Sequence, residues 1–207
     1  MRNRQRLIVG ISGASGIIYG MRLLELLRET EIETHLVVSR AGELTRKHEL
    51  GITAKELSSL ADEVYPCNDV GAAISSGSFR TMGMIIVPCS VKTLAEIATG
   101  NTTTLLSRAA DVVLKERRRL VLMVRETPLH SIHIKNMLAV TECGGIIMPP
   151  VPAFYSKPES LDAMVTNTTC RALDLFDIDT GMLKRWGEEL QIRQNSSSTH
   201  DFVSKTT

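Results

Sequence analysis

The chain has 207 residues, of which 43% are hydrophobic and 23% are charged, a composition typical of a globular protein. Its 24 Lys and Arg residues nearly balance 23 Asp and Glu residues. The resulting net charge of +1 argues against a dedicated nucleic-acid binder, which is normally strongly basic. Only 4% of the residues are aromatic, so a site of several stacked rings is not expected. The four cysteines lie far apart without a C-x-x-C motif, which favours reduced thiols over a disulfide framework or a zinc site.

The N-terminal segment MRNRQRLIVGI has a basic start followed by an apolar stretch, as signal peptides do. The apolar stretch ends after five residues, at Ser12, which is too short for a signal peptide. No segment is apolar over the roughly 18 residues that a membrane helix requires. We therefore expect a cytoplasmic protein without a membrane span.

Apolar runs and periodic apolar positions predict an alternation of strands and helices along the chain. Strands are predicted over 7–11, 34–39, 84–88, 120–124 and 146–148, and helices over 17–28, 105–117, 131–143 and 159–176. Thr53 to Glu56 form a capping box, which predicts a further helix start. This alternation predicts parallel βαβ units and a single-domain, doubly wound α/β sheet of the Rossmann-like kind. We expect this domain to span 1–190 and the polar tail 191–207 to be disordered.

Three polar loops follow predicted strands: 12–16, 89–93 and 125–128. Ligands of such sheets bind beyond the carboxyl ends of the strands, so all three loops should face one crevice. In the first loop the glycine spacing is G-x-x-G-x-x-G, and no acidic residue follows the second strand, so a mononucleotide fits better than NAD. A tight turn without a ligand remains an alternative for the first loop, as does a capped helix start for the second. The charged pair Arg125 and Glu126 favours a site over a structural ion pair.

Other polar features are weaker candidates. The basic run 117–119 is expected to be surface or a subunit contact, because cations are favoured at a helix C-terminus. His130 and His133 have a spacing that a metal accepts, but no third ligand stands near them. Ser15 lacks the G-x-S-x-G context of a hydrolase nucleophile, and Trp186 is by default a packing anchor.

Seven motifs occur in the same order as in one known family. They are SGASG (12–16), ISSGSF (74–79), PCSVKT (88–93), RAADVVLKERR (108–118), RETPL (125–129), IHIKNM (132–137) and PPVPAFY (149–155). On these motifs the chain resembles the UbiX-type flavin prenyltransferases, and the resemblance extends from Leu7 to Trp186.

The resemblance implies an enzyme that joins a dimethylallyl group from dimethylallyl phosphate to N5 and C6 of reduced FMN. It implies no metal, a UbiD-type decarboxylase that receives the prenylated FMN, and a homo-oligomer, expected to be a dodecamer, with active sites where subunits meet. The implied FMN-binding residues are Gly13, Ala14, Ser15, Ser39, Ser90, Val91, Lys92, Thr93 and Arg125. The implied prenyl phosphate contacts are Lys115, Tyr155, Arg171 and Arg108. The implied catalytic residues are Ser15, Glu49, Glu126, Lys115 and Trp186.

The residue types suit this chemistry. Cleavage of the allyl–phosphate bond builds charge on the phosphate, which Lys115, Arg171 and Tyr155 can stabilise. Closing the new ring at C6 removes a proton, for which Glu126 is the expected base, relayed by Ser15 or by the released phosphate. The aromatic face of Trp186 can protect the allylic cation.

Alternatives to a prenyltransferase remain open on the sequence. A flavin-dependent decarboxylase of the same superfamily carries an ASANT-type loop where this chain has CSVKT. The histidine base of such an enzyme would lie in the region of His48, which in this chain is followed by the UbiX-like Glu49. A non-catalytic FMN carrier would have no use for Lys115, Tyr155 and Arg171. The short 74–79 loop prevents assignment of a pocket residue there.

Overall fold

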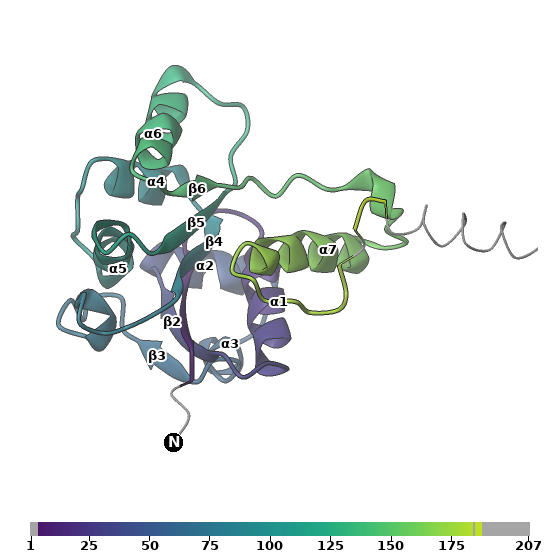
Figure 1. The fold of residues 1–207 in the computed structure, drawn as a ribbon, viewed down its shortest axis with the longest axis horizontal. Coiled ribbons are helices and arrows are strands. Elements are labelled where there is room, and N and C mark those ends of the chain that lie inside the picture. Colours follow the sequence, from purple (N-terminus) through teal and green to yellow (C-terminus); the bar gives the residue numbers. More distant parts are fainter. Residues whose placement is uncertain (1–3, 184, 188–207) are drawn as a thin grey trace, which may run out of the picture.

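The computed structural model describes residues 4–183 and 185–187. These residues form one six-stranded sheet in which every pairing is parallel, in the order β3-β2-β1-β4-β5-β6 (Figure 1). The strands are β1 (Arg6–Ile11), β2 (Glu33–Val38), β3 (Glu63–Tyr65), β4 (Gly83–Cys89), β5 (Arg119–Val124) and β6 (Ile146–Ile147). This order is that of doubly wound folds and confirms the predicted fold class.

Helices cover both faces of the sheet. They are α1 (Ile17–Arg28), α2 (Arg40–Glu49), α3 (Ala54–Ser58), α4 (Val91–Ala98), α5 (Leu105–Lys115), α6 (Ser131–Glu142) and α7 (Leu161–Asp174), with the short 3-10 turns η1 (Ala73–Ser75) and η2 (Phe154–Ser156). In Figure 1, α1 and α7 lie together on one side of the sheet and α4, α5 and α6 on the other.

Two buried clusters fill the space between the sheet and these helix layers. Successive strand residues point to opposite faces, so Ile8 and Met84 belong to the cluster under α4 and α5. Their neighbours Leu7 and Ile85 belong to the cluster under α1 and α7. Because both faces are covered, the central strands are almost continuously apolar, which is why the sequence revealed them.

The predicted element boundaries agree with the structure to within a few residues, but three elements were missed. These are α2, β3 and α4, none of which has a long apolar pattern. The capping box before α3 is confirmed, with both Thr53 and Glu56 making the reciprocal bonds. The predicted tail 191–207 lies outside the described residues.

Helix α6 differs from its expected amphipathic form. Only Val140 is buried, while Ile132, Ile134 and Leu138 are all more than half exposed. The helix packs on α4 and β6. A second apolar surface, with Ile132, Ile134 and Leu138, therefore remains uncovered by the described residues.

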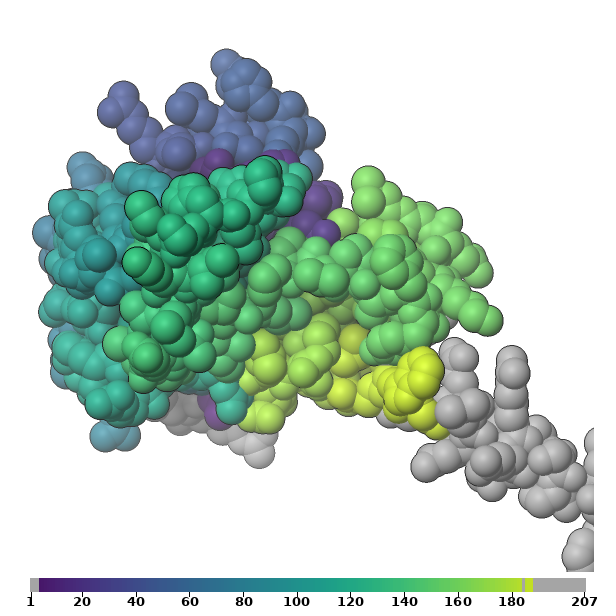
Figure 2. Space-filling model, turned by 90° about the horizontal axis from the view of Figure 1, so that it is seen from above, coloured from purple at the N-terminus to yellow at the C-terminus, as the bar shows by residue number. Residues whose placement is uncertain are grey.

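Residues 149–160, here called the arm, run away from the sheet to η2 and then into α7 (Figure 1). In Figure 2 the green segment that contains the arm and the start of α7 projects as a lobe beside the main body. Its apolar side chains Val151 and Phe154 are about three-quarters exposed, at 73% and 75%. In the part of the chain that the structure describes, no helix has the length and apolarity to cross a membrane.

Candidate active site

The loops that follow β1, β4 and β5 are bonded to one another at the carboxyl edge of the sheet. The Ser12 hydroxyl donates to the Pro88 carbonyl at 3.0 Å and accepts from the Ser90 backbone N–H at 2.7 Å. The Arg125 backbone N–H donates to the Cys89 carbonyl at 3.0 Å. The three loops therefore lie at one edge of the sheet, although the cavity at that edge is lined by residues of the first two loops and not by the expected third.

A cavity of about 430 Å³ opens beside the first two of these loops, between the ends of β1, β2 and β4. The N-cap residues of three helices line it: Ser39 of α2, Ser90 of α4 and Thr104 of α5. Helix N-termini carry partial positive charge and unpaired N–H groups. Three of them at one cavity, with Lys92 on its wall, make a site suited to a phosphate.

The predicted cofactor residues divide between this cavity and the adjacent loops. Gly13, Ser39, Ser90, Lys92 and Thr93 line the cavity. The hydroxyls of Ser39 and Ser90 each accept a backbone N–H of their own helix, so the capped-helix interpretation of CSVKT is correct. The Ser90 hydroxyl in turn donates to the Thr93 hydroxyl at 3.2 Å, and both of these hydroxyls lie on the cavity wall.

Gly13 allows the first loop to lie directly on α2. A Cβ atom built on Gly13 would lie 2.4 Å from the Ala41 Cβ, far inside any normal contact. The Thr45 hydroxyl donates to the Gly13 carbonyl at 3.2 Å and fixes the loop in this position. The glycine therefore has a packing reason to be there as well as a place on the cavity wall.

Ser15, Glu49 and Arg125 form a second group, next to the N-terminus of α1. Gly16 is the N-cap of α1 and has no side chain to cap it. The Glu49 carboxylate replaces that cap by accepting the N–H groups of Gly16 at 2.8 Å and Ile17 at 3.0 Å, and the Ser15 hydroxyl. Despite partial desolvation, these bonds and the charge of Arg125 hold the pKa of Glu49 below its ordinary value.

We expect Glu49→Gln to remove part of the pH dependence of stability. A depressed pKa means that the folded chain binds this proton less well than the unfolded chain. The stabilisation is fully present above the ordinary value of 4.5 and is lost as the pH falls through the lower folded pKa. At pH 7 the variant should lose on the order of 0.5–1 kcal/mol of unfolding free energy, a small effect because Glu49 is exposed.

Denaturant unfolding at pH 7 and pH 4, at one protein concentration, measures this difference. The difference in unfolding free energy between wild type and variant should be smaller at pH 4 than at pH 7. The exposed Glu159→Gln is the matched control and should leave the difference unchanged between the two pH values. An equal loss at both pH values would show that the carboxylate charge is not what stabilises α1.

Glu126 lies on the exposed loop after β5, next to Arg125. Its carboxylate accepts the backbone N–H of Thr127 at 3.0 Å and is exposed to solvent. Arg125 also acts on Tyr19, where burial raises the pKa of the phenol and the nearby positive charge opposes that rise. Arg125 therefore lies close enough to both Tyr19 and Glu49 to act on them electrostatically, and Glu126 is its neighbour in the chain.

The predicted residues of the C-terminal part also come together, but on the arm side of the molecule. The rings of Tyr155 and Trp186 meet edge to face with centroids 5.3 Å apart. Asp174 at the end of α7 pairs with Arg171 at 3.2 Å and with Arg185 at 2.6 Å, and bonds to Arg185 hold its pKa below the ordinary value. Trp186 packs on Tyr155 but is 75% exposed in the described part of the chain.

Lys115 lies at the far end of α5 from the cavity. The helix begins just after Thr104, on the cavity wall, and ten residues at about 1.5 Å each put Lys115 some 15 Å away along its axis. There it pairs with Glu116 and packs against the turn at Gly77. Arg108, on the same helix, pairs with Asp111 at 2.7 Å. A single chain therefore does not bring Lys115 to Ser15, Glu49 and Arg125.

Several cavity residues were not foreseen from the sequence. They are Arg40, Ala41, Leu44, Cys67, Asn68, Glu96, Thr103, Thr104 and Leu106. Cys67 and Asn68 follow the three-residue β3, which no apolar pattern reveals, and Thr103 and Thr104 belong to a loop that precedes α5. In the sequence, these residues could have been recognised only because their loops follow strands or precede helices.

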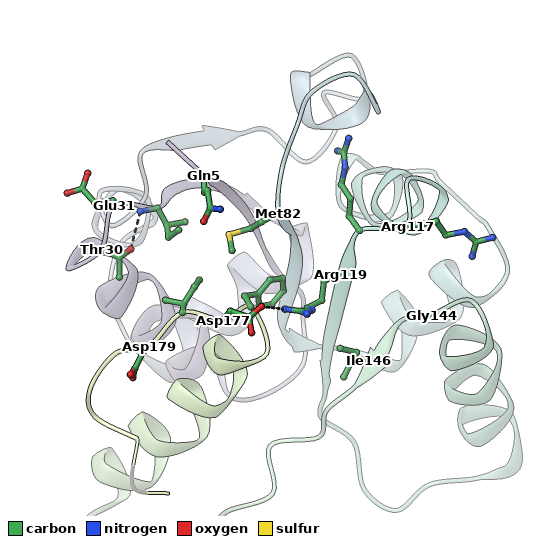
Figure 3. Close-up of a pocket in the computed structure, with 14 residues that line it drawn as sticks. Gln5, Thr30, Glu31, Met82, Arg117, Arg119, Gly144, Ile146, Asp177 and Asp179 are labelled. Atoms are coloured by element: carbon green, nitrogen blue, oxygen red, sulfur yellow. Dashed lines mark hydrogen bonds and ion pairs between the residues drawn. The ribbon is translucent and has the colours of Figure 1, made fainter. Parts of the chain in front are cut away.

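A second, wider cavity of about 850 Å³ lies at the opposite edge of the sheet (Figure 3). Arg119 and Ile146 begin β5 and β6, so the cavity is at the amino ends of the strands. Figure 3 shows Arg119 joined to Asp177, at 3.2 Å, and Arg118 donates to the carbonyls of Gly77 and Phe79. Because ligands of such sheets bind at the carboxyl edge, we place the active site at the smaller cavity.

Comparison with known proteins identifies the class of protein that this fold and site define. A flavoprotein family model matches residues 1–187. The flavin prenyltransferase UbiX of Neisseria meningitidis serogroup B is 55% identical over 182 residues, covering 88% of this chain and 96% of the relative. The chain therefore belongs to the flavoprotein family and, within it, to the UbiX flavin prenyltransferases.

Solved structures agree with this family. A crystal structure of AnUbiX with FMN and dimethylallyl pyrophosphate superposes with a TM-score of 0.88 at 51% identity, covering 89% of this chain and 98% of that chain. A dodecameric FMN-dependent UbiX-like decarboxylase from Escherichia coli O157:H7 has a TM-score of 0.86 at 48% identity, covering 88% and 99%.

Proposed function

We propose that this chain is a flavin prenyltransferase that transfers a dimethylallyl group from a dimethylallyl phosphate to reduced FMN. The observation that carries the proposal is the cavity on which the N-termini of α2, α4 and α5 converge, because it matches the phosphate-bearing end of a mononucleotide. The relationship to the UbiX flavin prenyltransferases supplies the reaction.

FMN lies with its phosphate in the cavity and its ring toward Arg125. Ser39, Ser90, Lys92 and Thr93 surround the phosphate end together with Gly13. Ala14, Ser15, Val91 and Arg125 belong to the same or adjoining loops and complete the cofactor set. Flavin is a substrate here, and its reduced form supplies the nucleophilic N5 and C6 positions.

The prenyl phosphate site is shared between copies of the chain. Lys115 and Arg108 lie on α5, Tyr155 and Arg171 lie on the arm side, and Glu126 lies on the loop after β5. These positions meet around one flavin when the α5 face of one copy packs beside the flavin loop of another. The apolar side chains exposed on α6 and the arm provide surfaces for such packing, and we propose a dodecamer by relation to the E. coli structure.

Lys115, Arg171 and Tyr155 stabilise the departing phosphate as the allylic C–O bond breaks and the oxygen takes the electron pair. Each such preorganised donor is typically worth about 2.7–4 kcal/mol. The allylic carbon forms its bond to N5, which gives up its proton to the released phosphate, and Trp186 presents an aromatic face to the cationic group. The prenyl double bond then takes a proton from the phosphate, and the tertiary carbon cation that results bonds to C6. Glu126 accepts the proton that C6 loses as the new ring closes, with Ser15 as the proposed relay.

The prenylated FMN is passed to a UbiD-type decarboxylase, and the protein acts in the cytoplasm. A reducing compartment suits both the reduced flavin and the four cysteines, which are free thiols in the structure.

The direct test is anaerobic incubation of the protein with reduced FMN and dimethylallyl monophosphate, followed by mass spectrometry of the flavin. We expect a gain of one five-carbon unit and release of free phosphate. Recovery of unchanged FMN that had been bound to the protein would favour a flavin carrier instead. A protein that bound no FMN would refute the assignment of the cavity itself.

A further inference from the structure

Glu96 of α4 is the one acidic residue among the described residues that line the 430 Å³ cavity. Its side chain is only 11% exposed, whereas that of Lys92, one turn earlier on the helix, is 71% exposed. The Lys92 ammonium donates to Glu96 Oε1 at 2.7 Å, and the Thr103 hydroxyl donates to the same oxygen at 3.2 Å. The carboxylate therefore joins the two sides of the cavity wall.

The backbone around Glu96 holds the same wall. The Asn101 N–H donates to the Glu96 carbonyl at 2.8 Å, and the Thr99 hydroxyl donates to the Ala95 carbonyl at 2.8 Å. The segment between α4 and α5 is thus fixed independently of the carboxylate charge. Removing that charge while keeping an oxygen acceptor should leave the wall in place.

The carboxylate also sets the charge of the cavity. Lys92 and Arg40 each bring one positive charge to the cavity wall, and Glu96 brings one negative charge that lies within hydrogen-bond distance of the Lys92 ammonium. The phosphate end of FMN carries close to two negative charges at neutral pH. A nearly buried carboxylate on the same wall opposes that phosphate more strongly than a solvated one would, because the local dielectric constant is lower.

We propose that Glu96 is a positioning residue that holds Lys92 and limits how tightly the cavity retains the flavin phosphate. This inference rests on the proposed function, in which prenylated FMN must leave the enzyme after each turnover. A cavity with an uncompensated Lys92 holds the phosphate longer and slows that release. Glu96 thereby lowers the affinity for the flavin phosphate and speeds the release of prenylated FMN.

The test is the affinity of wild type and Glu96→Gln for FMN and for riboflavin, which has no phosphate. Glutamine keeps an oxygen acceptor for Lys92 and Thr103 but removes the negative charge. We expect FMN to bind roughly 3- to 30-fold more tightly to the variant, as one charge at short range and intermediate dielectric predicts. Riboflavin affinity should be unchanged, and the FMN effect should shrink in high salt.

Two further variants make the comparison specific. Glu96→Asp keeps the charge and should keep the wild-type ratio of FMN to riboflavin affinity. Glu25→Gln on α1 removes another ion-paired carboxylate, 3.3 Å from Arg22 and away from the cavity, and should leave both affinities unchanged. Melting temperatures confirm that each variant is folded.

The inference is overturned if Glu96→Gln leaves FMN affinity unchanged, or if it shifts FMN and riboflavin affinity equally, which would indicate a purely structural role. Wild-type protein that binds no FMN would refute the proposed function and this inference with it. Normal FMN binding by the wild type together with an unaltered variant would refute the inference alone.

Discussion

Replacing Glu126 by Gln is expected to lower the rate of prenylated FMN formation by about 10²–10⁴-fold, the usual loss for a general base. An amide cannot accept the proton that leaves C6. The first step, cleavage of the allyl–phosphate bond, does not require this base. A burst of free phosphate at the wild-type rate should therefore precede the slowed formation of product.

The structure indicates that Glu126→Gln changes the reaction rate without disturbing the fold. Glu126 is exposed and its carboxylate accepts only a backbone N–H in the described structure, that of Thr127. The cost to stability should stay near the 0.5 kcal/mol that is normal for surface substitutions. Rapid-quench phosphate assays, followed alongside flavin absorbance, separate the two steps. Exposed Glu142→Gln is the matched control, and wild-type product formation in Glu126→Gln would leave the released phosphate as the base.

A mixed oligomer of two inactive variants should regain activity if the site is shared between chains. Lys115→Gln and Glu126→Gln are each expected to lose about 10²-fold or more in rate. In one chain, Lys115 lies some 15 Å along α5 from the cavity wall, and in the proposed shared site these two residues come from different copies. Random co-assembly in equal amounts then gives about one intact site in four, and about a quarter of wild-type activity.

Co-expression of the two variants with different affinity tags provides the mixed oligomer. The control is co-expression of Arg125→Gln with Glu126→Gln. These two residues are adjacent in one chain, so every site contains at least one defect and activity should stay low. Absence of recovery in the Lys115 and Glu126 mixture would show that both residues act from the same chain.

The sequence alone determined the sheet and the position of the loops. Buried parallel strands such as β4 are continuously apolar, because both faces of the sheet are covered, and such runs are visible without any structure. The polar loops after β1, β4 and β5 had to lie at one edge once the strands were parallel. The cofactor residues on these loops, such as Ser90 and Arg125, could be named for that reason and by resemblance.

Only the tertiary structure decided what these residues do to one another. Helix α2 has just Gly42 and Arg46 buried, so no apolar period revealed it, and the role of Glu49 as the cap of α1 was hidden with it. The pairing of Lys92 with Glu96 follows helical spacing, but the low exposure of Glu96 comes from the cavity wall around it. The separation of Lys115 from the flavin loops depends on the direction of α5 across the sheet. Local patterns record which residues are apolar, whereas contacts between elements distant in sequence depend on how the chain packs.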